Sequence, residues 1–224
     1  MRLYYNEAGV TLYHGDGLEV LASLADGSMG IVPLDPPYAM VPNAKNGADD
    51  GAAGTSGAPI RLLCELLQGA RRVLSSGGVA PLICDWRRVP DVSYLATLFG
   101  FRIATCVAWT RSTPGMGGFF RSSWDPVLVL SMGEPTCKDR AGIRNTIQVN
   151  APRPKVHPYE KPPALWAHVF SRVPPTTVFD PCAGVGSSML AAVACGHNWM
   201  GAEIDERYCE IAASRAGSRP ERTE

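Results

Sequence analysis

Two short motifs give the strongest indication of function in this 224-residue chain. The first is Asp35-Pro36-Pro37-Tyr38, and the second is Asp180-Pro181-Cys182-Ala183-Gly184-Val185-Gly186. Each follows an apolar run that is typical of a buried strand, residues 29–34 before the first and 176–179 before the second. Because ligands bind at the carboxyl ends of parallel strands, we expect both motifs to lie on the same rim of an α/β sheet.

The glycine-containing loop suits a ligand that is derived from a nucleotide and is positively charged. It lies at a predicted strand-to-helix turn, where Rossmann-like folds bind nucleotides, but Met189 replaces the third glycine of the dinucleotide pattern. The loop instead begins with Asp180, and Glu203 ends the next predicted strand, where an acidic side chain can hold two ribose hydroxyls. S-adenosylmethionine, a cation that contains adenosine, fits these features. A tight turn followed by a helix cap is the alternative.

The Asp-Pro-Pro-Tyr motif has groups that could activate an exocyclic amine of adenine or cytosine. Such an amine is a poor nucleophile because its lone pair is delocalised into the ring. The Asp35 carboxylate and the Pro36 carbonyl can accept hydrogen bonds from its two N–H groups. They can also stabilise the positive charge that develops as a methyl group arrives. The prolines fix the backbone, and Tyr38 offers a face for a base that has been flipped out of the duplex. An ordinary Pro-Pro turn is the alternative.

Composition and charge predict one globular domain over residues 1–224. Apolar residues make up 46% and charged residues 19% of the chain, which is typical of a folded α/β protein. The formal net charge is zero, but residues 138–155 contain five cationic side chains and a single aspartate. We therefore predict contacts with DNA phosphates for the five basic residues of this stretch, Lys138, Arg140, Arg144, Arg153 and Lys155, and also for Arg121 from a smaller basic cluster; solvated loops and helix ends are the alternative.

The cysteines and the apolar runs predict no metal site and no membrane contact. Seven cysteines are scattered without a CxxC spacing, which indicates neither disulfides nor a zinc site. No apolar stretch reaches the roughly 18 residues that span a bilayer. The first residues lack the apolar core of a signal peptide, so we expect a cytoplasmic protein.

Hydrophobic periodicity predicts alternating strands and helices. Strands are expected at residues 10–14, 30–34, 79–84, 101–109, 126–130, 176–179 and 199–204. Helices are expected at residues 16–24, 63–74, 89–98, 163–170, 187–195 and 206–216, with Ser75 to Gly78 ending the second of them. This alternation predicts an α/β fold with a mostly parallel sheet and helices on both faces. The small and polar segment 41–58 is expected to be a flexible loop, either a lid or an insertion without a role.

The order of the motifs resembles that of the amino-methylating DNA methyltransferases, which act on adenine N6 or cytosine N4. Five elements are similar to those of this family: residues 12–21, 35–38, 157–162, 180–188 and 201–205, the last followed by Tyr208 and Arg215. The catalytic motif precedes the cofactor loop, which is similar to the permuted, β-type arrangement of the family. The resemblance implies a Rossmann-like, S-adenosylmethionine-dependent methyltransferase fold with a short candidate DNA-recognition segment at residues 111–155.

The resemblance also implies roles for single residues. The catalytic set is Asp35, Pro36, Pro37 and Tyr38. The cofactor-binding set is Asp16, Lys161, Asp180, Cys182, Ala183, Gly184, Gly186 and Glu203, with an ordinary surface lysine as the alternative for Lys161. The chain departs from the family at Cys182, where phenylalanine is usual, and at Trp124-Asp125, where a His-Glu pair is frequent.

The predicted function is site-specific methylation of adenine N6 in double-stranded DNA, in a bacterial or phage restriction-modification setting. Adenine is favoured because the motif begins with aspartate, whereas cytosine-N4 enzymes more often have serine there; cytosine N4 is the close alternative. A dinucleotide-dependent Rossmann enzyme and an inactive DNA-binding homologue are the alternatives from other classes. A monomer and a homodimer both remain open.

Overall fold

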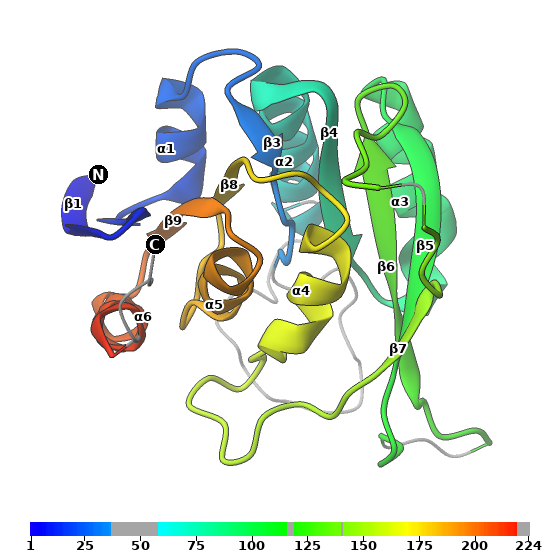
Figure 1. Ribbon diagram of the computed structural model, residues 1–224. Coiled ribbons are helices and arrows are strands. Elements are labelled where there is room, and N and C mark those ends of the chain that lie inside the picture. Colours follow the sequence, from blue (N-terminus) through cyan, green and yellow to red (C-terminus); the bar gives the residue numbers. More distant parts are fainter. Residues whose placement is uncertain (37–57, 116–118, 140, 219–224) are drawn as a thin grey trace.

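The computed structural model describes residues 1–36, 58–115, 119–139 and 141–218. In this part of the chain a nine-stranded sheet has the order β1-β2-β9-β8-β3-β4-β6-β5-β7 (Figure 1). The strands are β1 (Arg2–Glu7), β2 (Val10–His14), β3 (Met29–Ile31), β4 (Leu74–Ile83), β5 (Arg102–Thr110), β6 (Trp124–Ser131), β7 (Thr146–Gln148), β8 (Thr177–Asp180) and β9 (Asn198–Glu203).

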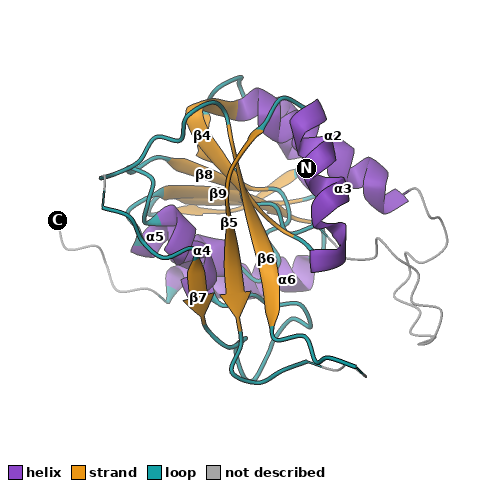
Figure 2. Ribbon diagram, turned by 90° about the vertical axis from the view of Figure 1, so that its right-hand side faces the viewer, coloured by secondary structure: helices purple, strands orange, loops and turns teal. Residues whose placement is uncertain are grey.

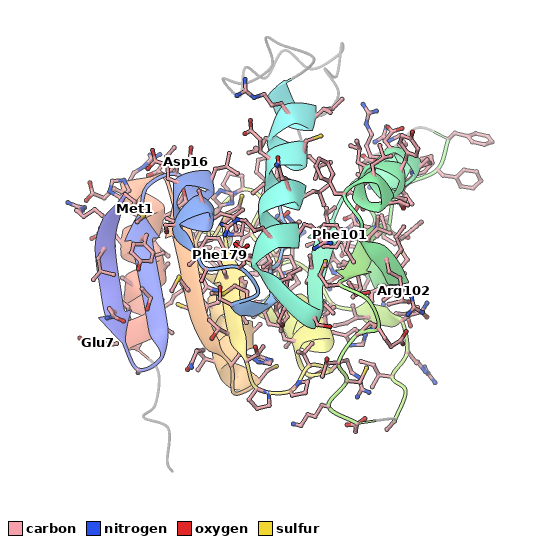
Figure 3. The ribbon with its side chains drawn as sticks, turned by 90° about the horizontal axis from the view of Figure 1, so that it is seen from above. Met1, Glu7, Asp16, Phe101, Arg102 and Phe179 are labelled. Carbon is pink, nitrogen blue, oxygen red and sulfur yellow. The ribbon has the colours of Figure 1, made fainter. Side chains whose placement is uncertain are left out.

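The centre of the sheet is parallel and its flanks are partly antiparallel. Strands β2, β9, β8, β3 and β4 pair in parallel, so their carboxyl ends share one rim. Strand β1 is antiparallel to β2, and β6 is antiparallel to both β4 and β5. Seen from above, Met1 and Glu7 mark one edge of the sheet and Arg102 lies towards the other (Figure 3).

The helices cover both faces of the sheet. They are α1 (Gly17–Ser23), α2 (Ala58–Val73), α3 (Val89–Leu98), α4 (Pro163–Phe170), α5 (Ser187–Ala194) and α6 (Glu206–Gly217), with a 3-10 turn at Trp86–Arg88. Buried side chains of α1, α2 and α3 belong to one hydrophobic core, and those of α4, α5 and α6 belong to the other. Figure 2 shows α2 and α3 on one side of the sheet and α4 and α5 on the other.

Alternation along the central strands explains why the sequence there is apolar without interruption. On β6, Val127 and Val129 pack into the core beneath α4 and α5, whereas Leu128 and Leu130 pack into the core beneath α2 and α3. Successive side chains of a strand point to opposite faces, so a strand covered on both faces needs apolar residues at both positions. The predicted mostly parallel α/β fold with helices on both faces is confirmed.

Several predicted element boundaries are corrected by the structure. Strand β4 begins at Leu74, directly after α2, so Ser75 to Gly78 lie within a strand and do not form a loop. The Gly77 N–H donates to the Met132 carbonyl at 2.8 Å, which ties this stretch to the end of β6. Strands β1 and β7 were not predicted, because their side chains are mostly exposed and show no clear apolar alternation. The predicted loop 41–58 lies outside the described residues, except for Ala58, where α2 begins.

No described helix has both the length and the apolar character that crossing a bilayer requires.

Gly17 allows the first turn of α1 to pack directly against the backbone of the loop after β8. A Cβ atom at this position would lie 2.0 Å from the Pro181 carbonyl oxygen, which is backbone and cannot turn aside. We expect Gly17→Ala to lower the free energy of unfolding by about 1–3 kcal/mol, the usual cost of overpacking. Urea denaturation measures this change. Gly142→Ala is the matched control, since a Cβ there meets nothing within 4 Å; an equal loss in both variants would contradict the steric explanation.

Candidate active site

The carboxyl ends of four neighbouring parallel strands bring the predicted motifs together. Asp180 ends β8, Glu203 ends β9, Asp16 follows β2, and Asp35 follows the extension of β3. A pocket of about 320 Å³ opens at this rim. Its lining includes nine residues of the predicted sets: Asp16, Asp35, Pro36, Lys161, Asp180, Cys182, Ala183, Gly184 and Glu203. The prediction of a shared rim is confirmed.

Gly186, the last residue of the glycine-containing loop, is not part of this lining; its φ of 80° places it in the left-handed region directly before α5. Pro37 and Tyr38 lie outside the described residues. The catalytic roles of the whole Asp-Pro-Pro-Tyr motif therefore stay predictions.

The Asp180 carboxylate holds the glycine-containing loop in shape. It accepts hydrogen bonds from the Cys182 N–H at 2.9 Å and from the Ser188 hydroxyl, and the side chain is buried. The Ser188 oxygen in turn accepts a hydrogen bond from the Trp199 indole at 3.0 Å. The loop is thus tied both to α5 and to β9, and its carboxylate is largely satisfied within the protein.

Burial raises the pKa of the Asp180 carboxyl to about 7. The hydrogen bonds from Ser188 and Cys182 oppose this rise, while the nearby carboxylates of Asp35 and Glu203 add to it. A carboxyl group with such a pKa ionises more readily when a cation enters the pocket, because an opposite charge favours the charged form.

Glu203 and Asp16 also bind backbone N–H groups of the rim. The two oxygens of Glu203 accept from the Gly184 and Asp205 N–H groups, each at 2.8 Å. Asp16 caps α1 by accepting from the Leu18 N–H at 2.8 Å. These bonds fix both carboxylates at the pocket wall; their contacts with a nucleoside stay predictions.

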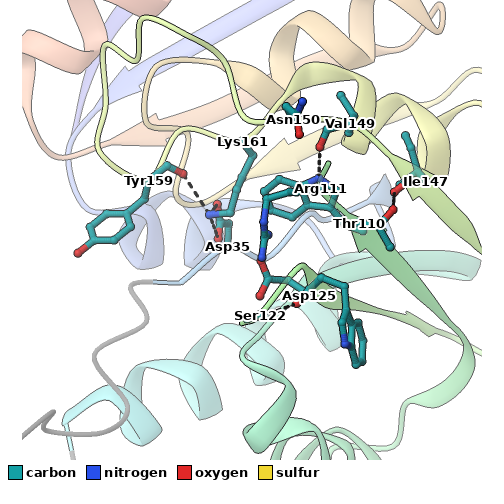
Figure 4. Close-up of polar contacts among 12 residues, drawn as sticks. Asp35, Thr110, Arg111, Ser122, Asp125, Ile147, Val149, Asn150, Tyr159 and Lys161 are labelled. Atoms are coloured by element: carbon teal, nitrogen blue, oxygen red, sulfur yellow. Dashed lines mark hydrogen bonds and ion pairs between the residues drawn. The ribbon is translucent and has the colours of Figure 1, made fainter. Parts of the chain in front are cut away.

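Lys161 is buried in the site and pairs with Asp35. Its Nζ lies 2.9 and 2.7 Å from the two carboxylate oxygens and 3.1 Å from the Tyr159 carbonyl (Figure 4). The residue is only 7% exposed, so the alternative of an ordinary surface lysine is wrong.

Sequence reasoning missed a second buried ion pair beside the pocket. Arg215 on α6 donates to Glu160 at 2.8 Å and to the Val185 carbonyl at 3.0 Å. The Glu160 side chain is 3% exposed, and its other oxygen accepts from the Val156 N–H at 3.1 Å. Glu160 lies within the resembling 157–162 element, which was the available signal, but its partner is 55 residues away in sequence. The pair joins this element to the cofactor loop.

Two other groups of the pocket have perturbed pKa values. Burial lowers the pKa of the His157 imidazole, whose ring packs edge-on against Tyr208 with centroids 4.5 Å apart. Burial also raises the pKa of the Cys182 thiol well above its usual value. A thiol that resists ionisation is a weak nucleophile.

The five described residues of the predicted DNA-contacting set lie in connecting segments at both rims of the sheet. Arg121 lies beyond β5 and β6 at the site rim and donates to the Gly115 carbonyl at 2.9 Å. Lys155 donates to the Pro158 carbonyl at 3.0 Å, and Arg153 lies in the same segment. Lys138 lies at the opposite rim, where its N–H donates to the Arg172 carbonyl at 2.8 Å. The carbonyl of Arg144 faces His168 of α4, and Arg140 lies outside the described residues. Their contacts with DNA stay predictions.

A family model described as DNA methylase matches residues 30–214. The chain belongs to the N6/N4 DNA methylase family. The type II methyltransferase M.HinfI of Haemophilus influenzae is 25% identical over 255 residues, covering 92% of this chain and 67% of that protein. The DNA adenine methyltransferase YhdJ of Escherichia coli K12 is 24% identical over 251 residues, covering 94% and 83%.

Solved structures share the fold of this DNA methylase. The cytosine-N4-specific PvuII DNA methyltransferase superposes with a TM-score of 0.78 at 16% identity, covering all of this chain and 91% of that one. The M1.HpyAVI–SAM complex superposes with a TM-score of 0.72 at 19% identity, covering 92% and 98%. The predicted methyltransferase fold and family are confirmed, and the alternative of a dinucleotide-dependent Rossmann enzyme is excluded.

The Glu160–Arg215 pair provides a stability prediction. Arg215→Met would leave the Glu160 carboxylate buried without its cation, which we expect to cost about 3 kcal/mol of unfolding free energy. Urea denaturation at neutral pH measures the loss. Adding Glu160→Gln to the same chain removes the unpaired charge and should recover part of it, whereas an additive effect of the two changes would show that the residues act independently.

The Asp180 carboxyl provides a pH prediction. Below pH 7 the Asp180 carboxyl is mostly protonated in the ligand-free protein. A cationic ligand favours the ionised carboxylate, so its binding must release the Asp180 proton. We therefore expect the affinity for S-adenosylmethionine to rise about tenfold between pH 5.5 and pH 7.5 and then to level off. Calorimetry in buffers of different ionisation enthalpy measures both the affinity and the proton release. Because His157 also lines the pocket, Asp180→Asn is the control; an unchanged pH dependence in that variant would assign the effect elsewhere.

Proposed function

We propose that this DNA methylase transfers a methyl group from S-adenosylmethionine to the N6 amine of adenine in double-stranded DNA. The observation that supports this most strongly is the position of Asp35 in the lining of an acidic pocket on the rim where β3 and β8 are neighbours. The pocket falls within the size range of small-molecule sites, roughly 300–1,000 Å³. Its wall combines carboxylates with a tight glycine-containing turn, which suits a cationic nucleoside.

The residues of the pocket fit the cofactor by charge and shape. The described lining has five acidic side chains, Asp16, Asp35, Glu160, Asp180 and Glu203, and Lys161 is its single Lys or Arg. S-adenosylmethionine has a net positive charge at neutral pH and supplies a methyl group on a sulfonium sulfur. Glu203 would hold the ribose, Asp16 would lie near the adenine, and the backbone from Asp180 to Gly184 would enclose the methionine part.

Asp35 and the Pro36 carbonyl would then receive the target amine. The two oxygens would accept hydrogen bonds from the two N–H groups of the amine. These bonds would localise the nitrogen lone pair and stabilise the positive charge that forms on nitrogen. As the N–C bond forms, the C–S bond would break with its electron pair staying on sulfur, and the nitrogen would release one proton to water. The amine is inaccessible inside a duplex, so the base must be flipped out first. Adenine is favoured because the motif begins with aspartate, and the relative YhdJ is named a DNA adenine methyltransferase.

Product analysis tests the target base. Wild-type protein is incubated with labelled S-adenosylmethionine and unmethylated duplex DNA, and the digested nucleosides are identified by mass spectrometry. We expect N6-methyladenine; N4-methylcytosine would keep the mechanism and reverse the base assignment. We also expect Asp35→Ala to lower turnover by about 100-fold or more while S-adenosylhomocysteine still binds. Bound cofactor without any methylated DNA from the wild type would contradict the proposed activity.

A further inference from the structure

The Asp35–Lys161 pair raises a question of charge within the pocket. Asp35 has to meet a weakly basic amine, yet it lies in a pocket that attracts a cation, and its side chain is 21% exposed. A free carboxylate in that position would pair with the nearest positive charge. The cofactor itself brings such charges, a sulfonium and an ammonium. An unprotected Asp35 would therefore be drawn to the cofactor and away from the base.

Lys161 already forms an ion pair with the Asp35 carboxylate in the structure. Its ammonium donates to both oxygens of Asp35, at 2.9 and 2.7 Å, and to the Tyr159 carbonyl at 3.1 Å. These contacts match the three N–H bonds of an ammonium group. Two contacts to one carboxylate also fix the plane of that group, and with it the direction of the lone pairs that remain for an incoming N–H.

The backbone around Lys161 is built to hold it in place. Pro162 and Pro163 follow it, and α4 begins at Pro163. On its other side Glu160 is anchored by Arg215, which also binds the Val185 carbonyl of the cofactor loop. The Lys161 side chain is 8% exposed, so the ammonium is enclosed by protein as well as paired. Its position is thus fixed relative to both the cofactor loop and Asp35.

We propose that Lys161 is a positioning residue for Asp35: it orients the carboxylate for the target amine and keeps it from pairing with the cationic cofactor. This inference rests on the proposed function and replaces the predicted role of Lys161 as a cofactor ligand. A lysine that bound the cofactor carboxylate would strengthen cofactor binding. A lysine that shields Asp35 opposes it, because it places a positive charge in a pocket for a cation.

The relative affinity for two cofactor forms distinguishes these roles. S-adenosylmethionine carries the sulfonium charge, and S-adenosylhomocysteine lacks it. We expect Lys161→Met to tighten binding of S-adenosylmethionine relative to S-adenosylhomocysteine by about 3- to 10-fold, because Asp35 becomes available to the sulfonium. Calorimetry without DNA gives both dissociation constants. Lys155→Met is the charge-matched control for these affinities: it removes a cation whose Nζ contacts the Pro158 carbonyl, and Lys155 is not part of the pocket lining, so the ratio should not change.

Turnover and a double-variant cycle test the link to Asp35. We expect Lys161→Met to lower kcat by about 100-fold without raising KM for S-adenosylmethionine, and Lys161→Arg to recover part of kcat. If Lys161 acts through Asp35, Asp35→Asn combined with Lys161→Met should lose no more turnover than Asp35→Asn alone. Thermal denaturation of each variant identifies any loss of turnover that comes from unfolding. The ratio of the two dissociation constants is then compared between Lys161→Arg and Lys161→Met at a temperature where both variants are folded.

The possible results separate this inference from the proposed function. Weaker binding of both cofactor forms by Lys161→Met, with kcat preserved, would make Lys161 a cofactor ligand and overturn the inference. Additive losses in the double variant would overturn it as well. A wild-type protein that binds neither cofactor form, or that methylates no DNA, would instead overturn the proposed function itself.

Discussion

The gathering of several carboxylates at one rim is the constraint on which this structure depends. Asp16, Asp35, Asp180 and Glu203 follow four adjacent parallel strands, and all four line the same pocket. Placing like charges together is unfavourable unless each has a partner, above all for Asp180, which is buried, whereas Asp35 and Glu203 are half-buried and Asp16 is exposed. The fold supplies such partners as backbone N–H groups of the rim, the Ser188 hydroxyl of α5 and the Lys161 ammonium, and the shape of the rim follows from those contacts.

Each carboxylate is compensated in its own way, and the differences indicate different tasks. Glu203 and Asp16 accept backbone N–H groups and so need no cation. Asp180 is the most deeply buried of the four, and its pKa rises to about 7 because hydrogen bonds from the loop offset only part of the cost of burial. Asp35 alone pairs with a lysine of the lining. The pocket therefore stays negatively charged where a cationic ligand would lie. Only Asp35, which we propose receives the target amine, is neutralised by a lysine.

The fold was largely predictable from the sequence, because its central strands and helices have strong apolar periodicity. Helices α3 and α4 begin and end where the sequence predicts. The shared rim was also predictable, since Asp16, Asp35, Asp180 and Glu203 each lie at or after the end of a strand of the parallel part of the sheet. What the sequence could not show is pairing: Lys161 and Asp35 are 126 residues apart, and no local pattern distinguishes a buried lysine from an exposed one. The edge strands escaped for a related reason, because β1 and β7 are mostly exposed and owe their conformation to pairing with β2 and β5.

The sheet topology explains why the order of the motifs along the chain can differ from their order in space. Strands β3 and β8 are neighbours, yet the chain leaves β3 towards α2 on one face and leaves β8 towards α5 on the other. The next strands then lie on opposite sides, β4 beside β3 and β9 beside β8. Ligands bind at such a reversal of strand order in open α/β sheets, and the described pocket lies at this point. Only the adjacency of β3 and β8 is needed to bring Asp35 to the cofactor loop, so either half can come first in the sequence while the site stays the same. The site is a property of this reversal point, and the permuted motif order leaves its geometry intact.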